Sequence, residues 1–405
     1  IKIGLDMMGG DFAPLEAVKG ASAFMAYNKE DVHLVLIGDE EKIKLHLDGN
    51  SMNPSSYSIV HAPQVIEMHE HPTKALKEKQ QSSIAVGFHL LATGKTDAFI
   101  SAGNTGAMMV GALFSIKAVE GVLRPTIGGY MPREDGTMGL LVDVGLNADC
   151  KPENLNQFAV LGSLFAEHIL KIEKPKVGLV NLGEEEGKGN ILAQATYPML
   201  KENNLINFVG NIEGRDLLIN KADVMVCDGF TGNVVLKLAE SIYDIVKRRQ
   251  IEDEHFERFN FETYGGVPVL GVSKPVIIGH GISHQTAFKN MIRIAVRMME
   301  TDLTGKIKAS LDGVPINPHD SMSYRGAMME NVPNFAMVFG YTNSSWTLKA
   351  DLIGSYVARL LKHMDDKGVR QVTPRNHKAD IKKQPFINNM SSGYIQRVID
   401  QIPQQ

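Results

Sequence analysis

Cysteine is scarce in this chain, and its scarcity excludes two kinds of protein. Of the 405 residues only two are cysteines, Cys150 and Cys227. Neither lies in a metal-binding spacing, and two cysteines cannot build a disulfide framework in a chain of this length. We therefore expect a protein of the reducing cytoplasm that has no metal site.

The chain also lacks a strong excess of charge and any long apolar run. Its formal net charge is −4, with 43% hydrophobic and 22% charged residues, which describes an ordinary globular protein. This balance gives no basis for a nucleic-acid partner. No apolar run is long enough to span a bilayer. The length allows one large α/β unit with an appendage, or two to three domains.

Nucleotide fingerprints are missing as well. No G-x-G-x-x-G follows an apparent strand, and no G-x-x-x-x-G-K-[ST] occurs, so NAD, FAD and P-loop nucleotides lack their usual signal. The G-x-S-x-G turn of serine hydrolases is also missing.

What the chain does contain is a regular alternation of apolar runs and amphipathic stretches. Strands are expected at residues 2–6, 32–38, 57–61, 97–101, 139–144, 176–182, 207–210, 223–227 and 275–279. Helices are expected at residues 14–28, 82–93, 107–118, 155–171, 190–203, 233–249 and 284–300. Several strands are apolar throughout, which is typical of strands covered by helices on both faces. The pattern therefore predicts an α/β fold with a doubly wound, mostly parallel sheet.

Polar and glycine residues gather where these strands end. The turn Ser101-Ala-Gly103-Asn104-Thr105-Gly106 joins one strand directly to a helix. Its glycines allow a ligand to approach the backbone, and the N–H groups of the first helical turn favour an anion. Taken alone, the turn fits a simple helix N-cap. Other strand ends carry similar residues, namely Asp6, Gly9, Gly10, Asp11, Asp143, Asn147, Asn181, Asp228 and Asn233.

The number of such ends favours a binding cleft over unrelated turns. In an open α/β sheet, ligands bind beyond the carboxyl ends of the strands. Right-handed crossovers should place these ends along one edge. We therefore predict a polar, backbone-lined cleft for a small anion, with phosphate or a phosphoryl group as the natural candidate.

The sequence motifs of this chain resemble those of the bacterial phosphate acyltransferases, the PlsX family. The motifs follow one another over residues 1–311, and they are the opening Ile3-Gly-Leu-Asp-Met-Met-Gly-Gly-Asp-Phe-Ala-Pro14, His71–Lys77, Ser101–Gly106, Asp143–Asn147, Gly183–Asn190, Asn211–Arg215, Asp228–Asn233, Tyr264-Gly-Gly and Gly279-His-Gly281. The resemblance implies a fold related to phosphotransacetylases and isopropylmalate-type dehydrogenases, usually as a homodimer.

The resemblance also implies a reaction. An acyl group passes from acyl carrier protein to inorganic phosphate, and the acyl phosphate feeds phosphatidic acid synthesis through an acyl-phosphate:glycerol-3-phosphate acyltransferase. No metal or organic cofactor is implied.

The residues fit this chemistry independently. Phosphate is itself the nucleophile and a thiolate leaves readily, so the protein mainly positions phosphate and stabilises an oxyanion. Asn104 and Thr105 suit the positioning. Lys188, between two glycines, is the candidate cation, although a solvent-facing loop lysine explains it too. His280, after an apolar strand, is the candidate acid for the thiolate, although a structural histidine fits equally well.

Acyl carrier protein is acidic in the family picture and needs a basic docking face. Lys289, Arg293 and Arg297 recur at every fourth position of one helix, and Lys247-Arg248-Arg249 form a second cluster. A solvated helix surface is the ordinary alternative. Relatives carry an amphipathic membrane arm where residues 250–260 are short and acidic here. We therefore expect a cytoplasmic protein with at most peripheral contact with the inner membrane face.

The pattern changes near Asp312. Residues 324–329 and 331–351 resemble the C-terminal end of flavin-containing or Baeyer–Villiger-type monooxygenases. Without a dinucleotide fingerprint this tail cannot assemble a flavin site. We expect a catalytic α/β domain at 1–312 and a non-catalytic fragment at 313–405.

Three other functions remain open from the sequence. The chain could be a phosphotransacetylase that acts on acyl-CoA, a flavin monooxygenase named by its tail, or an idle module that binds the carrier protein.

Overall fold

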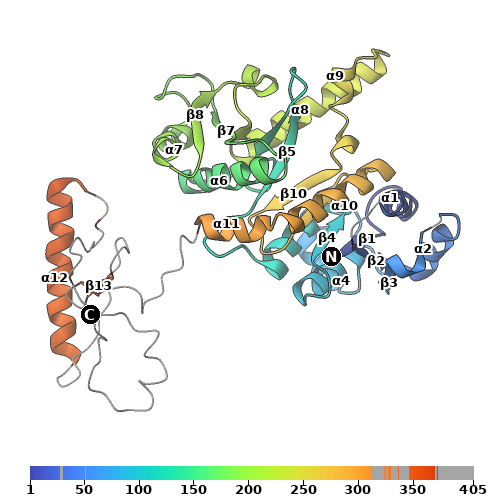
Figure 1. Cartoon of the computed structure of the whole chain (residues 1–405), viewed down its shortest axis with the longest axis horizontal. Coiled ribbons are helices and arrows are strands. Elements are labelled where there is room, and N and C mark those ends of the chain that lie inside the picture. The colour runs from blue at the N-terminus through green and yellow to red at the C-terminus, as the bar shows by residue number, and fades with distance from the viewer. Residues whose placement is uncertain are drawn as a thin grey trace. The chain divides into compact units, whose positions relative to one another are not determined.

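The computed structural model describes residues 1–27, 31–50 and 52–311, and within the tail 323–324, 327–329, 336, 346–369 and 372. The chain divides into two compact units, Ile1–Gly313 and Val314–Gln405. The first unit holds every residue that the sequence assigned to the site (Figure 1).

The first unit is built on one large sheet. Its strands, in sheet order, are β3 (Tyr57–His61), β2 (His33–Gly38), β1 (Lys2–Asp6), β4 (Ala98–Ser101), β11 (Val276–Gly279), β10 (Gly266–Leu270), β5 (Thr126–Pro132), β6 (Met138–Val142), β9 (Val224–Val226), β7 (Lys176–Val180) and β8 (Asn207–Ile212). Every predicted strand is present, and the predicted α/β class is confirmed. The sequence missed β5 and β10.

The two missed strands reverse the direction of half the sheet. Strands β3, β2, β1, β4 and β11 are parallel to one another, and so are β6, β9, β7 and β8. Three antiparallel pairs, β11–β10, β10–β5 and β5–β6, lie between these groups. An odd number of reversals makes the second half run opposite to the first. The prediction that all strand ends share one edge is therefore wrong.

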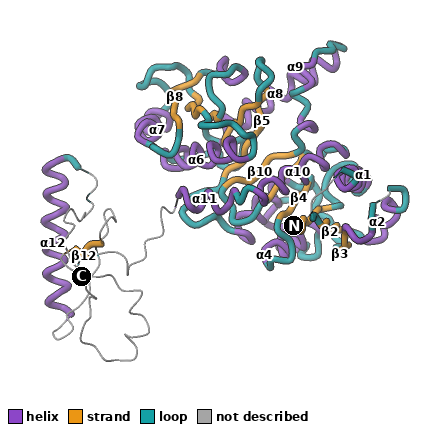
Figure 2. Tube along the Cα trace, viewed as in Figure 1, coloured by secondary structure: helices purple, strands orange, loops and turns teal. Residues whose placement is uncertain are grey.

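Helices enclose the sheet (Figure 2). They are α1 (Leu15–Met25), α2 (Glu40–Leu47), α3 (Pro72–Glu78), α4 (Ser83–Ala92), α5 (Thr105–Gly111), α6 (Pro152–His168), α7 (Ile191–Glu202), α8 (Gly229–Arg248), α9 (Glu254–Glu257), α10 (Gln285–Glu300) and α11 (Leu303–Leu311). Short turns of 3₁₀-helix occupy Pro54–Ser56, Gly214–Leu218 and Phe261–Thr263, and a π-helical turn occupies Ala112–Ile116.

Alternate strand residues point to two separate apolar cores. On β2, for example, Leu34 and Leu36 belong to one core and Val35 and Ile37 to the other. The first core lies under α1, α6, α10 and α11, and the second under α4, α5 and α8. Because both faces are buried in the interior of the sheet, strands such as β9 and β11 are apolar throughout, whereas the edge strands β3 and β8 have exposed positions.

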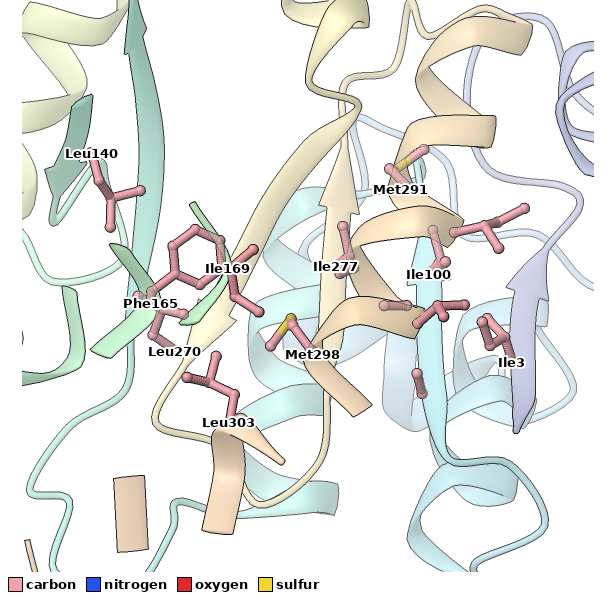
Figure 3. Packing of buried hydrophobic residues seen from close by; sticks show 14 of the residues in the cluster. Ile3, Ile100, Leu140, Phe165, Ile169, Leu270, Ile277, Met291, Met298 and Leu303 are labelled. Carbon is pink, nitrogen blue, oxygen red and sulfur yellow. The ribbon is translucent and has the colours of Figure 1, made fainter. Parts of the chain in front are cut away.

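Figure 3 shows the first core where it crosses the middle of the sheet. Met291 and Met298 of α10 pack beside Ile277 of β11, and Phe165 of α6 lies near Leu270 of β10. This packing joins the two halves on one face of the sheet.

The tail unit contains a small core of its own. Strands β12 (Ser323–Tyr324) and β13 (Met328–Met329) form a hairpin. Ala327 and Met328 cluster with Ile353 of α12 (Trp346–Lys367). Of residues 331–351, for which the sequence suggested a resemblance to monooxygenases, only 336 and 346–351 are among the described residues.

Candidate functional site

Asp6 accepts hydrogen bonds from two segments at the strand ends of the first half. The carboxylate is fully buried at the end of β1. Ser101 Oγ donates to Oδ2 at 2.6 Å, and Met8 N donates to Oδ1 at 2.9 Å. Burial raises the pKa of this carboxyl, although hydrogen bonds from Ser101, Ser83 and the backbone oppose the rise. Asp6 thereby joins the loop after β1 to the turn after β4.

Asn104 is occupied by structural hydrogen bonds. Its Oδ1 accepts from Ala107 N at 2.9 Å and caps α5, while its Nδ2 donates to the carbonyl oxygens of Glu67 at 2.9 Å and Glu70 at 3.1 Å. Thr105 beside it is exposed, and no hydrogen bond joins its hydroxyl to another described residue. Thr105 is therefore the freer of the two to contact a ligand.

Glycines at the strand ends of the first half allow the loops after β1 and β4 to pack closely against neighbouring residues. A Cβ at Gly9 would lie 2.5 Å from Gly103 N, and one at Gly106 would lie 2.3 Å from Pro72 Cγ. The loop after β11 joins them, because the N–H of Asp11 donates to the carbonyl oxygen of Gly281 at 2.7 Å. Gly10, at φ +99°, lies in the conformation that favours glycine.

A second polar cluster lies at the opposite edge, after β6 and β9. The carboxylate of Asp143 accepts from the N–H groups of Gly145 and Asn147 at 2.9 Å each, and burial raises its pKa. Asp228 caps α8 by accepting from Thr231 N at 2.9 Å. Asn233 Nδ2 donates to the carbonyl oxygen of Val144 at 3.2 Å, so the two loops are held together.

Lys188 also lies at this second edge, in the loop after β7. Asn181 Nδ2 donates to its carbonyl oxygen at 3.1 Å. Its side chain is exposed, and within residues 52–311 the ammonium group has no hydrogen bond or ion pair. Five strand spacings separate β7 from β11, or about 24 Å at about 4.8 Å per spacing. Within one chain, Lys188 and His280 also follow strands that end at opposite edges of the sheet.

His280 faces the carboxylate of Glu240, which no sequence motif marks. Its Nε2 lies 3.2 Å from Glu240 Oε1 of α8, and the ring of Phe261 packs on the imidazole at 4.6 Å between centroids. Burial alone would raise the pKa of Glu240, but His280 and Lys237 outweigh it and lower that pKa. Glu240 is therefore ionised at neutral pH and orients the imidazole. No described residue bonds Nδ1, so this nitrogen can exchange a proton with a ligand.

A cavity opens beside His280 because two strands diverge. Strands β5 and β10 pair only at Thr126–Leu270 and Ile127–Val269. Beyond these pairs lies a cavity of about 50 Å³. It is lined largely by apolar groups, including Leu236, Ala239, Phe259, Phe261, Tyr130 and Tyr264. An apolar space beside a histidine suits a ligand that has both an apolar and a reactive part.

The outer side of His280 faces an open groove of about 550 Å³. Phe12, Ile282, Lys237 and Lys247 line it together with His280. Lys247 begins the basic run that continues through Arg248 and Arg249. This predicted docking cluster therefore lies beside the groove.

The other predicted docking residues lie along α10. The Lys289 ammonium sits 5.2 Å from the ring centroid of Tyr27, and Arg297 donates to the carbonyl oxygen of Ile169 at 3.1 Å. Arg293 donates to Asn290 Oδ1 at 3.3 Å. None of the three forms an ion pair with another described residue, so all keep their charge available to a partner.

No group of three or more metal-ligating side chains occurs in residues 1–27, 31–50, 52–311 or the described positions of the tail. Across the same residues, no helix combines the length and hydropathy needed to cross a bilayer.

A known protein family and several related proteins match most of the chain. The family described as "Fatty acid synthesis protein" matches residues 1–306. A phosphate acyltransferase of Desulforamulus reducens is 46% identical over 330 residues, covering 77% of this chain and 98% of the relative. A phosphate acyltransferase of Dictyoglomus turgidum is 42% identical over 334 residues, which cover 78% of this chain and 98% of the relative. A solved phosphotransacetylase from Streptococcus pyogenes covers 74% of this chain and 94% of its own at a TM-score of 0.53 and 18% identity, which supports the fold alone.

Proposed function

The chain belongs to the phosphate acyltransferase family, and we propose that it transfers a fatty acyl group from acyl carrier protein to inorganic phosphate at the His280 edge. The observation that carries this proposal is the apolar cavity beside an imidazole held by an ionised carboxylate. The acyl chain enters the cavity, and the thioester remains at its mouth beside His280.

In net terms the reaction moves one proton from phosphate to the departing sulfur. A phosphate oxygen forms a bond with the thioester carbonyl carbon, and the tetrahedral oxyanion collapses as the C–S bond breaks. Nδ1 of protonated His280 gives its proton to the departing sulfur, and the proton released by phosphate returns to the imidazole. Glu240 holds the imidazole from the other side. Thr105, Gly9, Gly10 and neighbouring backbone N–H groups are the proposed contacts of phosphate.

The deciding assay incubates the full chain with acyl carrier thioester and phosphate. Acyl phosphate and free carrier should form in equal amounts. If acyl-CoA serves and acyl carrier does not, the chain is a phosphotransacetylase. Carrier binding without turnover would make it a binding module.

We propose that the tail takes no part in this reaction. A chain that ends at Leu311 should then match the full chain in the same assay, and a purified full chain should be colourless. A bound flavin, or activity lost with the tail, would contradict this view. The downstream acyl-phosphate:glycerol-3-phosphate acyltransferase and peripheral membrane contact also remain proposals, based on the family alone.

A homodimer is the proposed assembly, supported by an apolar row on α8. Phe230, Val234, Leu238 and Ile245 recur on one side of the helix and are 47–68% exposed. Exposed rows of this kind mark interfaces. Leu238→Glu should convert a dimer to a monomer in light scattering, whereas Leu45→Glu on α2, where the leucine is 70% exposed, should not. A wild-type monomer would refute the dimer.

Lys188 remains the proposed cation for phosphate, and we propose that a second copy supplies it, because within one chain Lys188 follows β7 at the sheet edge opposite His280. Lys188→Ala should lower turnover at least tenfold while carrier affinity stays unchanged, because one charged hydrogen bond is lost in the transition state. Equal amounts of Lys188→Ala and His280→Gln chains, mixed and refolded, should recover about a quarter of wild-type activity through heterodimers. Unchanged turnover of Lys188→Ala would remove the lysine from the reaction.

A further inference from the structure

Two tyrosine rings form the wall between the cavity beside His280 and a second pocket. Tyr130 belongs to β5, and Tyr264 precedes β10. Their ring centroids lie 5.3 Å apart at 31°. Both rings line the cavity of about 50 Å³ on one side and a pocket of about 210 Å³ on the other. The pair is thus shared by two spaces that it keeps apart.

The second pocket could hold an extension of an apolar chain. Ile169, Leu170 and Ile294 supply apolar surface, and Arg293 and Arg297 contribute to its lining. The first cavity is the smaller of the two. An acyl chain that passed between the rings would therefore gain buried surface beyond them.

In the part of the chain that the structure describes, no β-ladder closes the passage between the two spaces. Strands β5 and β10 are paired only at residues 126–127 with 269–270, away from both rings. No hydrogen bond joins either phenol oxygen to another described residue. Burial raises the pKa of Tyr264 to about 12 and also raises that of Tyr130, so both hydroxyls are neutral at physiological pH. Removing one ring would open the wall without breaking a ladder or a polar contact.

We propose that Tyr264, packed on Tyr130, limits the length of the acyl chain that this site accepts. A chain that reaches the rings stops there, and further methylenes must stay in water or displace an aromatic side chain. The inference rests on the proposed function, because it takes the cavity beside His280 as the acyl site.

The test measures kcat/KM for a series of saturated acyl carrier thioesters that differ by two carbons. In Tyr264→Ala the optimum should move to longer chains, with a gain of up to about fourfold for each additional methylene that becomes buried. Tyr264→Phe keeps the ring and should keep the wild-type optimum. Tyr197→Ala, on α7 and outside both pockets, is the matched control and should keep the same optimum.

A second variant leaves both rings in place and tests whether the cavity that they close holds the acyl chain. Ala239→Leu adds bulk inside the first cavity and should move the optimum to shorter chains. An unchanged optimum in the folded Tyr264→Ala chain would overturn the inference. If that chain does not fold, an unchanged optimum in Ala239→Leu would overturn it. A wild-type chain that forms no acyl phosphate at any length would instead refute the proposed function.

Discussion

Replacing His280 by glutamine should lower turnover about 10²-fold, with little change in KM for the acyl carrier thioester. Glutamine can still reach Glu240 but cannot give a proton to sulfur. The loss is expected at the lower end of the range for general acids, because a thiolate leaves readily. Steady-state kinetics of the two chains provide the measurement.

The matched control is His168→Gln on α6. This histidine lies 3.4 Å from the Lys306 ammonium, away from the groove and the cavity. Its replacement should leave turnover and KM as they are. Wild-type turnover in His280→Gln would show that the reaction takes place elsewhere.

Replacing Asp6 by alanine should lower the free energy of unfolding by about 3 kcal/mol at acidic pH. The change leaves the Ser101 hydroxyl and the backbone N–H groups of the β1 loop without their buried acceptor. Urea unfolding gives the value. Asp48→Ala, at an exposed position, should change it by no more than about 0.5 kcal/mol.

The difference in stability between the wild type and Asp6→Ala should depend on pH. The folded-state pKa of Asp6 lies above its unfolded value, so the folded chain binds this proton more tightly. The associated stability is complete below the unfolded value of about 3.9 and is lost as pH rises through the raised folded value. The variant has no such group, so its deficit relative to wild type should narrow with rising pH. A constant or growing deficit would contradict the buried, proton-binding carboxyl.

How much the sequence could predict depended on which signal each element carried. Strands such as β2 are continuous apolar runs, and their burial under helices made them easy to recognise. β5 contains Gly128, Gly129 and Pro132, and β10 contains Gly266 and Pro268, residues that are depleted in strands. Missing these two strands hid the reversal of direction, and this led to the error about the sheet edges.

Some residues of the site could likewise be recognised from the sequence and others could not. His280 stood out because glycines flank it after an apolar strand. Glu240 is one of several charged residues on an amphipathic helix, and only the tertiary fold brings it to His280. Tyr130 and Tyr264 face each other across strands that are more than 130 residues apart in the chain, so no local pattern could pair them.

The order of strands also fixes the order in which a ribosome could complete the two halves. Strands β5 to β9 pair among neighbours between Thr126 and Val226, so all strand pairs within the second half can form once that stretch has emerged. The first half waits for β11, because Val276 pairs with Phe99 and Gln285 N reaches Glu16 across 269 residues. During synthesis the nascent chain therefore holds β1 to β4 without their final neighbour. His280 reaches its place only after most of the unit has been made.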